Sequence, residues 1–188
     1  MVDLETLGTT AGCVLLSIGC ATVEYTNGDW GVHSTFYHRI NLKSSLDEGF
    51  AIDADTIMWW LKQDEDARKS IYDNEGLDVC FVLSAFNEWV KASELDIDNR
   101  MLWGNGATFD IGIFMKAYRM TGYSEKQLPF IQDKNNRCYR TLKNVFSHVP
   151  KPDKTGTAHH ALDDALWQAH HLAAILNTID TMAELSQP

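Results

Sequence analysis

The chain opens with apolar runs typical of strands and continues with amphipathic stretches typical of helices. Residues 11–26 are rich in β-branched and apolar side chains and predict a long, largely buried strand. Asn27-Gly28 is a hairpin turn signal, and residues 30–40 predict the returning antiparallel strand. A shorter apolar run that stops at Gly8 predicts a strand before this hairpin. The first 40 residues therefore predict a strand followed by an antiparallel hairpin.

Helical spacing dominates the rest of the chain, and it is clearest over residues 78–92. Asp53 or Asp55 is expected to cap a helix that runs to Leu61, and Asp64 to cap the next. The remaining expectations are a short strand over 101–103, helices over 108–120, 138–146 and 157–177, a loop over 127–136, and a frayed end over 178–188. This order predicts a single α/β domain, 1–188, with a mixed sheet of antiparallel and parallel strands flanked by helices.

Composition narrows the class of protein. With 188 residues, 45% of them hydrophobic, the chain is long enough for one substantial core. The apolar run over residues 11–23 is too short to span a membrane. The cysteines are far apart and show no CxxC pair, which favours free thiols in a reducing compartment such as the cytoplasm over disulfides or a zinc site.

The charge is uneven along the chain. A formal net charge of −10 argues against a protein that coats nucleic acid regardless of sequence, because such a protein needs a basic face. One segment, residues 134–154, nevertheless carries six of the 16 basic residues: Lys134, Arg137, Arg140, Lys143, Lys151 and Lys154. The segment is either a solvated surface or a patch that holds a polyanion at one place.

Acidic residues mark the boundaries of three predicted elements. Asp3 and Glu5, two residues apart in the first strand, would point to the same face. Such a pair is costly beside apolar neighbours unless a cation lies between the carboxylates, and Mg²⁺ suits it. Asp110 begins a helix after a buried strand, and Asp163 and Asp164 open the last helix. Taken singly, each also fits a solvated strand end or a helix start with favourable charge.

Three motifs together resemble the DEDDh 3′–5′ exonuclease family, which has a ribonuclease H-like fold. They are Asp3-x-Glu5-Thr6, Asn105 with Asp110, and His159-x-Ala161-Leu162-x-Asp164, in the order of the family. The stretch Thr56-Ile57-x-Trp59-Trp60-x-x-Gln63 is similar to the branch of ribonuclease AS and exodeoxyribonuclease VIII-like enzymes, which are often encoded by phages.

The resemblance implies hydrolysis of RNA or DNA from the 3′ end, with release of nucleoside 5′-monophosphates. Two Mg²⁺ or Mn²⁺ ions would be bound by four acids, and a histidine would be the general base. The implied ligands are Asp3, Glu5, Asp110 and Asp164. Helical spacing favours pairing His159 with Asp163, or His160 with Asp164. The resemblance selects His159 with Asp164 and leaves His160 as the reserve base.

The resemblance also implies contacts to the substrate. Thr6, Leu7 and Gly8 would hold the terminal nucleotide, and Asn105 would lie beside it. Either Trp59 or Trp60 would stack on a base while the other packs in the core, because adjacent helical residues point about 100° apart. Arg137 and Arg140 would bind phosphates. Relatives in this branch are often dimers, so a homodimer is expected.

Two rival functions and one choice of substrate stay open at this point. A non-catalytic nucleic-acid-binding module could share the fold. A mononuclear zinc hydrolase could use His159, His160 and Asp164, since zinc favours nitrogen ligands. RNA and DNA differ by the 2′-hydroxyl, and no motif encodes a contact to it. Cys138 stands where many relatives carry an acid, which leaves the base preference open.

Overall fold

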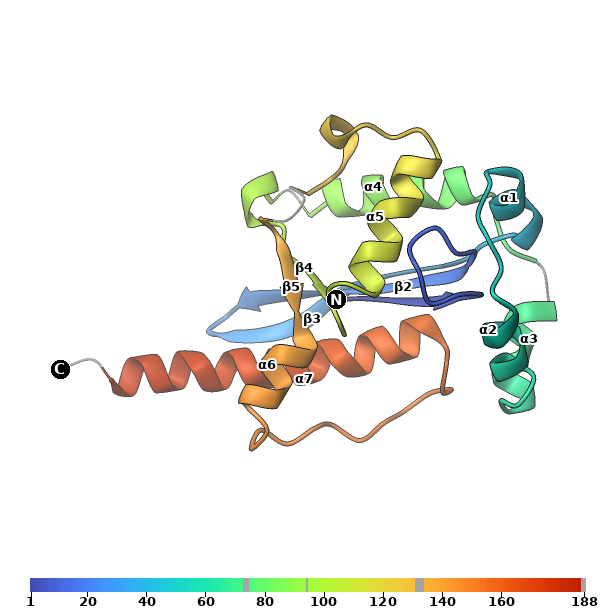
Figure 1. Ribbon diagram of the computed structural model, residues 1–188. Coiled ribbons are helices and arrows are strands. Elements are labelled where there is room, and N and C mark those ends of the chain that lie inside the picture. Colours follow the sequence, from blue (N-terminus) through green and yellow to red (C-terminus); the bar gives the residue numbers. More distant parts are fainter. Residues whose placement is uncertain (73–74, 94, 131–133, 187–188) are drawn as a thin grey trace.

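The computed structural model describes residues 1–72, 75–93, 95–130 and 134–186. Its centre is a five-stranded sheet with the order β3-β2-β1-β4-β5 (Figure 1). The pair β1–β2 and the pair β2–β3 are antiparallel, whereas β4 runs parallel to both β1 and β5. The strands are β1 (Val2–Thr6), β2 (Leu15–Thr26), β3 (Asp29–Arg39), β4 (Leu102–Gly104) and β5 (Asn136–Cys138). This sheet confirms the predicted α/β fold class with a mixed sheet of antiparallel and parallel strands.

Helices cover both faces of the sheet. In Figure 1, α6 and α7 lie on one face, and α4 and α5 lie on the other. The helices are α1 (Leu42–Asp47), α2 (Ala54–Trp60), α3 (Glu65–Tyr72), α4 (Val79–Lys91), α5 (Asp110–Met120), α6 (Tyr139–Val145) and α7 (Ala161–Leu185), with short 3-10 turns at Ile97–Asn99 and Glu125–Gln127. Within the described residues, no helix is long and apolar enough to cross a bilayer.

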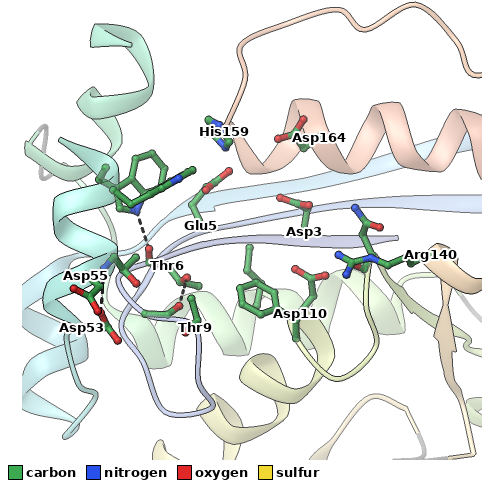
Figure 2. A pocket seen from close by; sticks show the side chains of 17 residues that line it. Asp3, Glu5, Thr6, Thr9, Asp53, Asp55, Asp110, Arg140, His159 and Asp164 are labelled. Atoms are coloured by element: carbon green, nitrogen blue, oxygen red, sulfur yellow. Dashed lines mark hydrogen bonds between the residues drawn. The ribbon is translucent and has the colours of Figure 1, made fainter. Parts of the chain in front are cut away.

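The alternation along β1 separates the core from the site. Val2 and Leu4 are buried with side chains of α4 and α5 in the larger apolar cluster. Because successive strand residues point to opposite faces, Asp3 and Glu5 turn the other way, toward the start of α7 (Figure 2). The expectation that both carboxylates share one face of the first strand is confirmed.

Local signals explain where several elements begin and turn. Asn27 and Gly28 both have positive φ, 55° and 95°, as the tight turn between β2 and β3 requires. Asp53 is the N-cap of α2 and accepts from the Thr56 N–H at 3.0 Å. Asp78 caps α4 in the same way. The predicted hairpin and both helices are therefore confirmed.

Other boundaries differ from the expectations. Residues 127–136 were expected to form a loop, but Asn136–Cys138 is strand β5, held by pairing with β4; residues 131–133 of that expected loop lie outside the described residues. The helix expected over 138–146 is confirmed as α6, which begins at Tyr139. Helix α1 was not predicted, because its six residues show no clear hydrophobic pattern. Helix α7 begins at Ala161 and continues to Leu185, so the expected fraying after residue 177 is wrong up to that point. Its last turns are held by Trp30, whose indole N–H donates to Asp180 at 2.8 Å.

Candidate active site

A pocket of about 550 Å³ lies where β1 ends (Figure 2). Its walls come from β1 and the following loop, from α2, from the β4–α5 connection and from the start of α7. All four acids and the histidine selected from the sequence line it: Asp3, Glu5, Asp110, His159 and Asp164. Asp3, Asp110 and Asp164, each more than 50 residues from the next along the chain, thus meet in one cavity.

Each acid is positioned by its backbone. Strand β1 supplies Asp3 and Glu5, and the first turn of α5 supplies Asp110, which is 4% exposed. Asp164 comes from the first turn of α7, which lies close against the sheet. That approach depends on Gly19, the β2 residue paired with Asp3, because a Cβ there would overlap the Ala161 backbone.

Two side chains contact the acids directly. Gln168 donates from Nε2 to Oδ1 of Asp3 at 2.8 Å. It lies one helical turn after Asp164, so both face the sheet from α7. Lys154 lies with Nζ 2.8 Å from Oδ1 of Asp164. Neither contact was predicted from the sequence, although the spacing of Asp164 and Gln168 was a usable signal.

The acids crowd negative charge into a buried space. Burial raises the pKa of Asp3 well above its usual value, and Asp110 raises it further. Burial, followed by the charge of Asp3, raises the pKa of Glu5 to about 9. Burial also raises the pKa of Asp110 to about 6, against the lowering effect of a hydrogen bond from the Asn105 backbone. The nearby charges of Lys154 and Arg140 lower these pKa values but do not offset the burial and the mutual repulsion of the acids.

This donor set fits a hard divalent cation. One ligand atom each from Glu5, His159 and Asp164 lie within 4.8 Å of one another, and the oxygens of buried carboxylates are what Mg²⁺ and Mn²⁺ prefer. Among the described residues this group does not include His160. The trio expected for a zinc hydrolase is therefore not assembled here.

The two histidines have different surroundings. His159 adopts a left-handed backbone conformation, with φ of 60°, and its ring meets the Trp59 ring edge-on at 4.9 Å. His160 is the N-cap of α7: its Nδ1 accepts from the Asp163 N–H at 3.4 Å, and its ring lies 4.5 Å from that of Tyr37. Of the pair, His159 lines the pocket.

The tryptophan pair differs in burial, as expected, although both residues border the pocket. Trp60 is 1% exposed, and its indole N–H donates to the Thr6 carbonyl at 2.9 Å. Trp59 is 43% exposed and borders the pocket beside His159. The buried tryptophan thus fixes the end of β1, while its neighbour presents a ring to the cavity.

The segment after β1 is only partly in the pocket. Thr6 and Gly8 line it, and the Thr6 hydroxyl donates to the Gly8 carbonyl at 2.7 Å. Leu7 does not, because its side chain packs in the core and is 2% exposed. This placement gives no support to the expected contact between Leu7 and the terminal nucleotide.

The predicted phosphate-binding arginines also separate. Arg140 lines the pocket and donates from Nη2 to the Asn105 carbonyl at 2.7 Å; Asn105 lines the pocket as well. Arg137 turns back on its own segment, donating to the carbonyls of Lys134 and Asn136, and is not among the lining residues. Only Arg140 is placed to meet a ligand in the pocket.

Several lining residues had no signal in the sequence. Thr9, Asp53, Asp55 and Phe109 line the pocket but were not selected as site residues, although Phe109 lies between Asn105 and Asp110. Asp53 was identified only as a helix cap, a role that it also has. These residues become neighbours only when the chain folds, so a pattern within one short stretch of sequence does not show that they share a pocket.

Comparison with known proteins places the chain in a family. A solved structure of cell-death related nuclease 4 is similar over 96% of this chain, with 14% identity and a TM-score of 0.47, and the chain spans 63% of that nuclease. No curated protein matches the sequence. A family model for the 3′–5′ exoribonuclease Rv2179c-like domain matches residues 1–176, in agreement with the exonuclease class predicted from the sequence. The chain therefore belongs to the Rv2179c-like family of 3′–5′ exoribonuclease domains.

Proposed function

We propose that this chain is a metal-dependent exonuclease that removes nucleoside 5′-monophosphates from the 3′ end of RNA. One observation carries the proposal: three distant segments bring four carboxylates and a histidine into a single pocket. The family description supplies the polarity and the choice of RNA. The proposal includes the expectation that residues 1–188 form a single domain.

The four acids would hold two Mg²⁺ or Mn²⁺ ions. The residues fit that role because three of them are buried together with raised pKa values, so bound cations would relieve a real electrostatic cost. When bound, the ions would activate water and stabilise the leaving 3′ oxygen. The ligands would be Asp3, Glu5, Asp110 and Asp164, as in the DEDDh pattern.

His159 would be the general base that takes the proton of the attacking water. The proposal is supported by the position of its ring, because a ring nitrogen lies within 4.8 Å of carboxylate oxygens of Glu5 and Asp164. His159 precedes α7 at the end of a segment that contains Gly156, whose φ of 84° sets the turn before the histidine.

The remaining lining residues would hold the 3′ end. Thr6 and Gly8 would contact the terminal ribose, and the exposed face of Trp59 would stack on a base. Arg140 would meet a phosphate. Because the net charge is −10, binding would rest on these local contacts and on the metals. The expected homodimer stays a prediction, which light scattering would test.

The rival functions have weaker support. A non-catalytic binding module would not need four acids and a histidine facing one cavity, yet all five line it. A zinc hydrolase would need His160 as a ligand, and that ring instead lies against Tyr37.

The direct test uses RNA and DNA oligonucleotides of one sequence, labelled at the 5′ or the 3′ end. After chelation, Mg²⁺ or Mn²⁺ should restore activity and Zn²⁺ should not. We expect 5′-labelled RNA to shorten stepwise and the 3′ label to appear at once as a mononucleotide. Asp3→Ala should abolish both signals. Internal cuts, shortening from the 5′ end, or activity that persists in chelator would contradict the proposal.

A further inference from the structure

Lys154 forms an ion pair with one of the four acids. Its Nζ lies 2.8 Å from Oδ1 of Asp164; the lysine side chain is 47% exposed and the aspartate 16%. Among the described residues, no other ion pair involves these acids. Arg140, the basic residue that lines the pocket, donates to the Asn105 carbonyl instead. Within the part of the chain that the structure describes, Lys154 is thus the basic side chain in direct contact with one of the four acids, while Arg140 acts on Asp110 from further away.

The chain holds this lysine in place from both sides. Before it, the carbonyl of Pro152 accepts from the indole N–H of Trp167 at 2.8 Å, and Lys154 Nζ lies 6.0 Å from the centre of the same indole. After it, the Thr157 N–H donates to Asp163 at 2.8 Å. Two anchors on α7 therefore fix the loop that presents Lys154 to Asp164.

The same carboxylate belongs to the group suited to a metal. Asp164 offers an oxygen within 4.8 Å of ligand atoms of Glu5 and His159. An ammonium and a divalent cation on one carboxylate repel each other, and the repulsion is strong where solvent is scarce. Lys154 and a cation at this group therefore compete for Asp164.

We propose that Lys154 is a placeholder cation, which neutralises Asp164 in the metal-free chain and gives way when a metal ion binds. The inference rests on the metal site of the proposed function. It implies that the ion pair stabilises the metal-free fold and lowers the affinity of the site for metal ions.

The test compares metal binding by the full chain and three variants. Lys154→Gln removes the charge, Lys154→Arg keeps it, and Lys151→Gln removes a charge from an exposed position in the same segment. Titration calorimetry with Mn²⁺ should show about two- to fivefold tighter binding for Lys154→Gln, the range expected for losing a partly exposed ion pair. Lys154→Arg should resemble the wild type, and Lys151→Gln should change affinity less than Lys154→Gln.

Thermal unfolding gives a second readout. In chelator, Lys154→Gln should unfold at a lower temperature than the wild type, because Asp164 loses its partner. With saturating Mn²⁺ the difference should close or reverse, since a tighter-bound ligand adds more stability. A residue that merely supports the loop would cost the same stability in both conditions.

The outcomes separate this inference from the function beneath it. Unchanged or weaker Mn²⁺ binding by Lys154→Gln, in a wild type that binds Mn²⁺ and degrades RNA, would overturn the placeholder role and leave the nuclease intact. A wild type that binds no Mn²⁺ would overturn the metal site and the inference together.

Discussion

Glu5 combines two properties that oppose each other in a metal-free protein. It is 7% exposed, and the carboxylates of Asp3, Asp164 and Asp110 raise its pKa in addition to burial. Its charged form is therefore unfavourable in the folded chain until a cation is present. Such a residue lowers the stability of the metal-free fold while it serves as a metal ligand. Its effect on stability and its effect on activity can be measured separately.

The pH dependence of stability should reveal Glu5. With a pKa near 9 in the folded chain and near 4.5 unfolded, the folded state keeps a proton that the unfolded state releases. Stability in chelator should therefore fall as pH rises between these values, by up to about 1.4 kcal/mol per pH unit for one proton. Urea unfolding of the wild type and Glu5→Gln at several pH values measures the difference.

Glu5→Gln should become progressively more stable than the wild type as pH rises toward 9, while losing activity at every pH. Mg²⁺ should narrow the gap by stabilising the wild type. Parallel stability curves for the two proteins across this range would show that Glu5 is charged in the folded metal-free chain.

The two histidines offer a matched pair of substitutions. His159→Ala should lower kcat by roughly 10²- to 10⁴-fold, as loss of a general base does, with little effect on thermal stability. His160→Ala should instead cost stability, about 1 kcal/mol, through loss of the α7 cap. Steady-state kinetics and thermal unfolding of both variants check this. The opposite pattern would assign the base to His160.

At the scale of elements, the site depends on how closely α7 approaches the sheet. Gly19 in β2 lies opposite Asp3 and leaves room for the Ala161 backbone. This contact sets the distance between the acids of β1 and Asp164. Packing between elements, and not any one side chain, therefore decides whether the carboxylates form one cluster.

Gly19→Ala should separate these elements. The added methyl would overlap Ala161 and Leu162, so α7 must shift, at about 1–3 kcal/mol of stability. Displacement of Asp164 by about 1 Å should lower activity by about a hundredfold. Gly31→Ala, in the same sheet but with only an ordinary contact for the added methyl, 3.8 Å from His33 Nε2, is the control for both unfolding and kinetics. Equal effects of the two substitutions would contradict the packing argument.

Element prediction from the sequence succeeded where the signal was local. The turn at Asn27-Gly28 and the cap and apolar spacing of α4 are properties of short stretches, and both are present. Strand β5 was missed because three residues are too few to show a period, and only its pairing with β4 makes it a strand. The last turns of α7 were missed because Trp30, far away in sequence, holds them.

At the scale of the whole molecule, the motifs indicated which residues meet but not how each is supported. The three motifs that contain Asp3, Asp110 and Asp164, in the order of the family that they resemble, were enough to select the acids that share the pocket. Burial of Leu7 and the ion pair of Lys154 depend on tertiary packing, so no motif could reveal them. Roles carried by contacts across the fold need the structure.

The central claim is that distant segments build one metal-dependent nuclease site, and two adjacent acids test it. Asp164 lines the pocket, whereas Asp163 accepts from the Thr157 N–H outside it. The measurement is the rate of mononucleotide release from 3′-labelled RNA with Mg²⁺. Asp164→Asn should lose more than about a hundredfold, beyond the cost of removing a residue that only supports a ligand, and Asp163→Asn should stay within a few-fold of the wild type. Equal rates for the two variants, or a larger loss for Asp163→Asn, would contradict the account.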